Sequence, residues 1–210
     1  IKYLIPYIKK NKAVLYVNVG DYKNVWDELI RDIPQMRELA TEHFDNWKDT
    51  KAFATKALSA SQINNSDVVT DNNRDDNSKN ITADNSSEDT SDNITGIHGF
   101  YHKNIFEAVY CTNLLMRSAD VLVTKPSELA FYPVPKLFIK RVGGHEQWGA
   151  VHSAEIGDGT LECRDIPHTL QMIKLFMEDD TYIIDMCKNI KKNKQMGIYN
   201  GAYEAVKLAV

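Results

Sequence analysis

Polar residues cluster after two predicted strands in the second half of the chain, and their types suit a phosphorylated ligand that carries hydroxyl groups. They are Lys125, Ser127 and Glu128 after the apolar run 121–123, and Gly143, Gly144, His145 and Glu146 after the run 136–139. A helix N-terminus binds phosphate through its free N–H groups, and an acidic side chain accepts hydrogen bonds from ribose hydroxyls. Because parallel sheets bind ligands at the carboxyl ends of their strands, we expect these two turns to form one site.

Each of these residues also has a purely structural explanation. Ser127 follows Pro126 and suits the N-cap of a helix that we expect to begin there. Glu128 is well placed beside the positive end of that helix. His145 suits a ligand donor, a proton carrier or a plain surface histidine, and Lys125 either contacts a phosphate or only lines its turn. The residue types alone leave these alternatives open.

The elements that must position these residues alternate between strands and helices. The predicted strands are 13–19, 94–97, 121–123 and 136–139, and helices are predicted around 26–33, over 44–58 and 105–116, from 127, and over 145–154, 168–177, 181–191 and 199–208. Gly20 follows the first strand and suits a loop that approaches a phosphate. Strands that alternate with helices imply a parallel sheet with right-handed crossovers, so the predicted fold class is α/β.

One segment, 64–93, differs from the rest in composition. It is dominated by Asn, Asp and Ser, carries eight acidic and two basic residues, and has no aromatic residue. Such a segment buries too little apolar surface to offset the entropy of ordering, so we expect a disordered insertion. Asp71, Asn73 and Asp75 resemble the start of a calcium loop, but Asp76 stands where the loop needs glycine and Thr82 where it needs glutamate. We expect no metal site.

Charge, hydropathy and cysteine usage limit the classes of function. The net charge is −4 and no basic stripe is interleaved with aromatics, so no nucleic-acid partner is expected. No apolar run approaches the roughly 18–20 residues that span a bilayer. The three cysteines, Cys111, Cys163 and Cys187, are too widely spaced for a metal or redox motif and are expected to be free thiols. These features predict a cytoplasmic protein.

The residues of the two polar turns and their flanking strands resemble the C-terminal, nucleotide-sugar-binding half of a GT-B glycosyltransferase. The nearest resemblance is to the family 28 group of lipid-II-forming N-acetylglucosaminyltransferases and monogalactosyldiacylglycerol synthases. The segments that carry it are Thr124-Lys125-Pro126, Ser127-Glu128-Leu129-Ala130, Pro135-Lys136-Leu137-Phe138-Ile139, Gly144-His145-Glu146, where the family often has G-Q-E, and Gly99-Phe100-Tyr101, where it has G-F-V. The resemblance covers residues 94–160 well and 13–33 loosely.

The resemblance implies a Rossmann-like parallel sheet with helices on both faces, forming one half of a GT-B fold, and a UDP-sugar as donor. Glu128 would hold the ribose hydroxyls, while His145 and Glu146 would face the donor sugar. Backbone at Phe100 and Tyr101 would meet the uracil. The remaining residues that the resemblance places at the donor are Gly20, Lys125, Ser127 and Gly144. Catalytic residues stay unassigned, and no cofactor or metal is implied besides the UDP-sugar itself.

The implied activity is inverting, metal-independent hexosyl transfer from the UDP-sugar to an unknown acceptor. Residues 1–12 would be a linker or the end of a missing N-terminal domain, and 13–210 a single donor-binding domain interrupted by 64–93. The partner would be that missing domain or a separate acceptor-binding subunit, with a lipid acceptor or peripheral attachment to the inner membrane face also open. The family turn carries extra glycines where Pro126 here runs into Ser127, and its Gln and Asn are His145 and Gly149. The alternatives are therefore an inactive nucleotide-binding or scaffolding domain and a relative of the UDP-sugar 2-epimerases.

Overall fold

The structure, a computed structural model, describes residues 1–66 and 93–209. Its contacts group the chain into an N-terminal unit, Ile1–Ser118, and a C-terminal unit, Ala119–Val210. Each unit has its own small sheet, whereas we expected residues 13–210 to form one domain. Both sheets are parallel and both units contain helices, so the chain has a mixed α/β fold. Most of the insertion expected over 64–93 lies outside the described residues, and helix α3 continues to Ser66 at its start.

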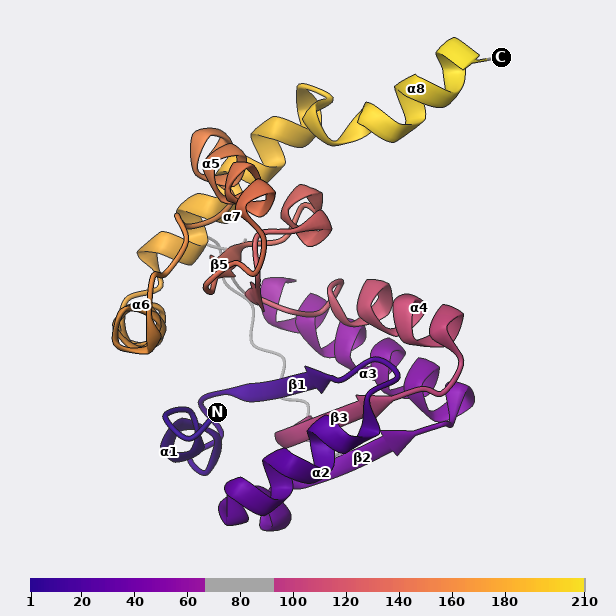
Figure 1. The fold of residues 1–210 in the computed structure, drawn as a ribbon, viewed down its shortest axis with the longest axis vertical. Coiled ribbons are helices and arrows are strands. Elements are labelled where there is room, and N and C mark those ends of the chain that lie inside the picture. The colour runs from indigo at the N-terminus through magenta and orange to yellow at the C-terminus, as the bar shows by residue number, and fades with distance from the viewer. Residues whose placement is uncertain (67–92, 210) are drawn as a thin grey trace, which may run out of the picture. The chain divides into compact units, whose positions relative to one another are not determined.

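The N-terminal unit is built on three parallel strands, β1 (Val14–Asn18), β2 (Ala40–Phe44) and β3 (Gly96–Tyr101). Their order is β1-β3-β2, so the last strand in sequence lies at the centre (Figure 1). Strand β2 corrects our expectation, which had no strand between residues 20 and 94. Its polar residues explain the error, since Glu42 accepts a hydrogen bond from Trp26 Nε1 at 2.8 Å and His43 is buried among aromatic rings.

Helices pack on both faces of this sheet (Figure 1). One face contacts α1 (Ile5–Ile8), α2 (Lys23–Asp32) and the 3-10 helix η1 (Pro34–Glu38), and the other contacts α3 (Trp47–Ser66) and α4 (Ile105–Leu115). Ile97 and Trp26 belong to the first core, and Phe100 and Phe53 to the second. The alternation of a strand therefore divides β3 between two cores. Because Ile5 and Ile8 are buried in the first core, the segment 1–12 is packed as part of this unit.

The C-terminal unit is built on two parallel strands, β4 (Leu122–Thr124) and β5 (Lys136–Phe138). An isolated parallel bridge joins Lys136 to Gly159, so a third segment runs along β5. The helices are η2 (Glu128–Phe131), η3 (Gly144–Glu146), α5 (Gln147–Ile156), α6 (Ile166–Glu178), α7 (Thr181–Gln195), η4 (Ile198–Asn200) and α8 (Gly201–Ala209). Leu137 packs toward α6 and α7, whereas Phe138 packs against Ala130 and Ala150.

A buried ion pair connects β5 to the C-terminal helices. Lys136 Nζ lies 2.8 Å from Asp158 Oδ2, and both side chains are fully buried. The Tyr199 hydroxyl in η4 donates to the same carboxylate oxygen at 2.8 Å. Lys136 also donates to the carbonyl oxygens of Tyr132 and Val134, at 2.8 and 3.0 Å. The pair therefore holds η4 and the turn before β5 against the sheet. Among the helices of the described residues, none is long and apolar enough to cross a membrane.

Candidate functional site

The turns that follow β4 and β5 are joined by one ion pair. Lys125 Nζ contacts Glu146 Oε1, and Lys125 lies directly after β4 while Glu146 ends the turn after β5. The side chain of Glu146 is only 6% exposed, whereas that of Lys125 is 43% exposed. The structure thus brings the two predicted halves of the site together at the carboxyl ends of neighbouring parallel strands, the edge at which such sheets bind ligands.

Glu146 is occupied by bonds within its own turn. Its Oε2 accepts hydrogen bonds from the backbone N–H groups of Val142 at 2.8 Å and Gly143 at 3.1 Å. The hydrogen bond from Lys125 and then these two N–H groups lower the pKa of Glu146 to about 2. The same contact raises the pKa of Lys125. Glu146 is therefore a fixed anion that shapes the turn, and Lys125 remains a cation beside it.

The turn after β5 is also held from its other side. Arg141 Nη1 donates to Glu162 Oε2 at 2.7 Å, and the Arg141 backbone N–H donates to Glu162 Oε1 at 3.0 Å. Two carboxylates therefore position three consecutive N–H groups of this turn, those of Arg141, Val142 and Gly143. Arg141 and Glu162 are not among the residues predicted from the sequence. Their only signal was an arginine two residues before the first of the paired glycines and an acid 21 residues after that arginine.

Ser127 and Glu128 lie in a tighter turn than we expected. The predicted helix from Ser127 is wrong, because η2 spans only Glu128–Phe131 before Pro133 and Pro135 interrupt the chain. The Ser127 hydroxyl makes no capping bond, and its N–H donates to the Lys125 carbonyl at 2.8 Å. The Glu128 side chain is exposed.

His145 and Gly144 are exposed at the start of η3, which leads directly into α5. A Cβ atom added at Gly143 would lie 2.6 Å from His145 Cε1, so the imidazole lies over Gly143. A Cβ atom added at Gly144 would meet no atom within 4 Å. The first N–H groups of a helix have no carbonyl in a preceding turn, so this helix start presents free donors beside an open space.

Gly149 fixes how close α5 lies to the turn after β4. A Cβ atom at this position would lie 2.6 Å from the carbonyl oxygen of Pro126 and 3.1 Å from Ala130 Cβ. In the same contact the Ser153 hydroxyl donates to the Ala130 carbonyl at 3.1 Å. The residue that departs from the resembled family at this position is thus the one that lets α5 approach η2.

Three residues that the resemblance places at the donor, Gly20, Phe100 and Tyr101, lie in the N-terminal unit. Gly20 follows β1 with φ of +62°, and its N–H donates to Asn18 Oδ1 at 3.0 Å. Phe100 is fully buried in the core. The carbonyls of Phe100 and Tyr101 accept from Val19 and Asp45 at 3.0 and 2.9 Å. These two carbonyls are therefore occupied by neighbouring backbone.

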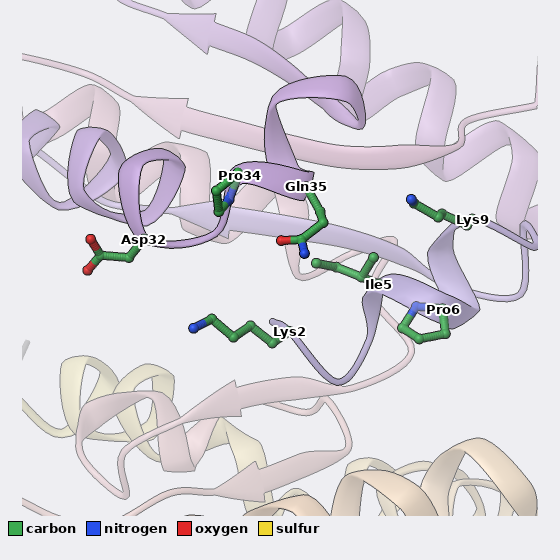
Figure 2. A pocket seen from close by; sticks show the side chains of 7 residues that line it. All are labelled: Lys2, Ile5, Pro6, Lys9, Asp32, Pro34 and Gln35. Carbon is green, nitrogen blue, oxygen red and sulfur yellow. The ribbon is translucent and has the colours of Figure 1, made fainter.

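A hollow of about 660 Å³ lies elsewhere in the N-terminal unit. Figure 2 shows side chains from the first residues and α1 on one side and from the end of α2 and η1 on the other, among them Lys2, Ile5, Lys9, Asp32, Pro34 and Gln35. Asp32 is already paired with Arg31 at 2.9 Å. The hollow contains none of the predicted site residues. Within 1–66 and 93–209, no three His, Cys, Asp or Glu side chains gather so as to hold a metal ion.

A family model described as Domain of unknown function (DUF6938) matches residues 1–210. The comparisons with curated proteins and with solved structures gave no match.

Proposed function

The chain belongs to the DUF6938 family, and we propose that its C-terminal unit binds the UDP-sugar donor of an inverting, metal-independent hexosyltransferase. The observation that carries this proposal is the Lys125–Glu146 ion pair, which brings the turns after β4 and β5 into contact. We also propose that this unit belongs to the Rossmann-like, donor-binding half of a GT-B enzyme.

Glu128 would bind the ribose of the donor. Its carboxylate is exposed, and within the described residues it makes no hydrogen bond or ion pair. Its charge does act on the neighbouring Lys125. A carboxylate at the carboxyl end of a parallel strand suits the two hydroxyls of a ribose, since each of its oxygens accepts one hydrogen bond.

The diphosphate would lie against the start of η3 and α5. The free N–H groups of Gly144 and His145 and the positive end of the helix dipole favour an anion there. Lys125 adds a cation at the same edge. When the bond from sugar to UDP breaks, negative charge develops on the leaving diphosphate, and donors fixed before the reaction stabilise that charge. Glu146 holds Lys125, and Glu146 and Glu162 together hold the turn that leads into these N–H groups, which supports this role.

His145 is the side chain best placed to contact the sugar or the diphosphate. It is exposed and sits at the first turn of the helix start, with its ring over Gly143. Both ring nitrogens of a histidine can donate or accept according to its protonation. Movement of the ring away from Gly143 would let it reach a bound ligand.

Calorimetric titration of the whole chain with UDP and with UDP-sugars tests this proposal. Glu128→Gln should weaken UDP binding by about 1–3 kcal/mol, because it replaces a charged acceptor of the ribose hydroxyls by a neutral group. Glu155→Gln is the matched control, because Glu155 is an exposed acid on α5, away from the helix start. The proposal fails if no UDP binding occurs in the millimolar range while the fold is intact, or if both variants bind as the parent does.

A second candidate is a nucleotide-binding or scaffolding domain without turnover. The turn after β4 supports it, because the Ser127 N–H bonds back to the Lys125 carbonyl and leaves no loop of free N–H groups there. Binding of UDP without transfer of the sugar to any acceptor, or to water, would favour this candidate over the enzyme.

A further inference from the structure

Three side chains between α3 and the sheet of the N-terminal unit form a continuous chain of contacts. Asp49 Oδ2 lies 2.6 Å from His43 Nδ1, and His43 Nε2 lies 3.1 Å from His98 Nδ1. At the far end, His98 Nε2 lies 3.0 Å from the carbonyl oxygen of Thr95. Both histidines are buried, at 6% and 8% exposure. The three contacts therefore link the first turn of α3 to β2 and β3.

Counting hydrogens along these contacts shows that the two imidazoles together carry one extra proton. The Thr95 carbonyl can only accept, so His98 carries its hydrogen on Nε2. A neutral His98 then accepts at Nδ1, and His43 must donate from Nε2. The Asp49 carboxylate also only accepts, so His43 must donate from Nδ1 as well. With His98 neutral, all three contacts are hydrogen bonds only when His43 is an imidazolium.

The surroundings of the two rings agree with this assignment. His43 stacks on Phe100 with ring centroids 4.7 Å apart and planes at 10°, and the face of an aromatic ring attracts a cation. Burial, with a smaller contribution from the nearby charge of His43, lowers the pKa of His98 to about 4, although the hydrogen bond to the Thr95 carbonyl acts in the opposite direction. Asp49 is 44% exposed, so water solvates its charge. The proton therefore rests on His43, between a carboxylate and a neutral imidazole.

We propose that this proton is a pH-sensitive link between α3 and the sheet. While His43 carries it, the hydrogen bonds hold the first turn of α3 against the sheet. Without this proton, only two hydrogens remain for the three contacts. In one contact two acceptor lone pairs then face each other, and no hydrogen bond forms. A buried polar group left without a partner is costly, so the turn loosens. The neighbouring contact, from Thr50 Oγ1 to His102 Nε2 at 3.0 Å, lies in the same turn of α3.

Other titratable groups lie near the contacts between Asp49, His43 and His98. Tyr16 of β1 meets the His98 ring edge-on at 6.2 Å, and Cys111 of α4 lies in the same core. Burial raises the pKa of the Cys111 thiol to about 12, so it stays uncharged. Beyond Thr50, His102 Nδ1 lies 3.6 Å from Glu107 Oε2. Asp49 is thus the carboxylate in contact with His43 in the described part of the chain.

One substitution separates the proton from the hydrogen bonds. In Asp49→Asn the amide can donate to His43 Nδ1, so a neutral His43 completes all three contacts without an extra proton. The variant should keep the fold and lose the pH response. Asp21→Asn removes an exposed carboxylate of the same unit and serves as the matched control.

Hydrogen exchange of the α3 backbone amides over residues 50–58 tests the proposal in the full chain. After correction for intrinsic exchange, protection in the parent and in Asp21→Asn should fall roughly tenfold or more between about pH 5 and about pH 9. Protection in Asp49→Asn should stay constant over the same range. Constant protection in the parent, or an equal fall in Asp49→Asn, overturns the proposal.

Nitrogen NMR of the two imidazoles reports which ring nitrogens carry a proton. A contact with a purely structural role would not require the protonation pattern proposed for His43 and His98. Near neutral pH the parent should show both His43 nitrogens protonated and His98 protonated only at Nε2. In Asp49→Asn, His43 should become neutral at the same pH. A neutral His43 in the parent, or a His98 protonated at Nδ1, contradicts the assignment.

Discussion

Lys125 and Glu146 form an ion pair between the turns that follow β4 and β5, although 21 positions separate them in the chain. The carboxylate of this pair also accepts two backbone N–H groups of its own turn. The pair therefore does two things, since it fixes the shape of the second turn and keeps a cation at the edge of the sheet.

Lys125→Met should raise the pKa of Glu146 from about 2 toward the ordinary carboxyl range. The hydrogen bond from Lys125 is the largest cause of the low value, and the N–H groups of Gly143 and Val142 would remain. Because the folded pKa is depressed, the contribution of Glu146 to stability is present above the ordinary range and is lost as pH falls toward about 2. An NMR titration of the carboxyl carbon measures the value.

Lys140→Met is the control for this titration, because Lys140 is an exposed lysine that precedes the same turn. It should leave the titration of Glu146 unchanged. If Glu146 titrates at the same pH in the parent and in Lys125→Met, the ion pair does not control this carboxylate.

Gly149→Ala should destabilise the C-terminal unit by about 1–3 kcal/mol, because the new methyl group would overlap the Pro126 carbonyl oxygen. Gly201→Ala is the matched control, since a Cβ atom at that helical position meets nothing within 4 Å. It should be neutral or stabilising by up to about 1 kcal/mol. Urea denaturation measures both free energies of unfolding. Equal effects of the two substitutions would show that α5 does not pack closely on Pro126.

Lys136→Met should cost about 3–5 kcal/mol of stability, because it leaves Asp158 buried without its cation. The double variant Lys136→Met/Asp158→Leu should recover part of that loss, since it removes the stranded charge as well. These two variants and the single variant Asp158→Leu are measured by urea denaturation. A double variant that is less stable by the sum of the two single effects would contradict the ion pair.

Tyr199→Phe, which removes only the hydroxyl donor to Asp158, should cost about 1 kcal/mol of stability.

His98 predicts a pH dependence of the N-terminal unit in the acidic range. Burial lowers its pKa from 6.5 to about 4, so between these values the unfolded chain binds a proton that the folded chain does not. Stability should therefore fall as pH drops from about 6.5 to about 4, by about 1–2 kcal/mol after allowance for solvent screening. His98→Gln should flatten this fall, measured by denaturation at several pH values. His168→Gln, in the other unit, should not; if it does, His98 is not the group responsible.

Much of the secondary structure could be predicted from the sequence. The apolar runs around β1, β4 and β5 each became a strand, and the helical spacing of Trp26, Leu29, Ile30 and Ile33 became α2. Strand β2 could not be found, because its Glu42 and His43 look like surface residues until Trp26 and His98 provide their partners. Those partners come from other elements of the fold, which no local pattern contains.

The site could be predicted in outline only. The sequence predicted that the turns after β4 and β5 lie close together, and the contact between Lys125 and Glu146 shows that they do. That they bind a ligand stays a prediction. It did not show that Glu146 is buried and occupied, or that η2 replaces the expected helix. The assignment of Gly20, Phe100 and Tyr101 to the donor came from resemblance alone. These three lie in the N-terminal unit, and their roles stay predictions.

A nitrogen–proton NMR titration of the whole chain with UDP locates the binding site as well as detecting binding. We expect saturable shifts of the backbone amides of Lys125, Ser127 and Glu128 and of residues 143–147, which belong to the two turns joined by Lys125 and Glu146. Glu128→Gln should shift the same amides at higher UDP concentration. No saturable shift at millimolar UDP, or shifts confined to amides outside these turns, would contradict a UDP site at the carboxyl ends of β4 and β5.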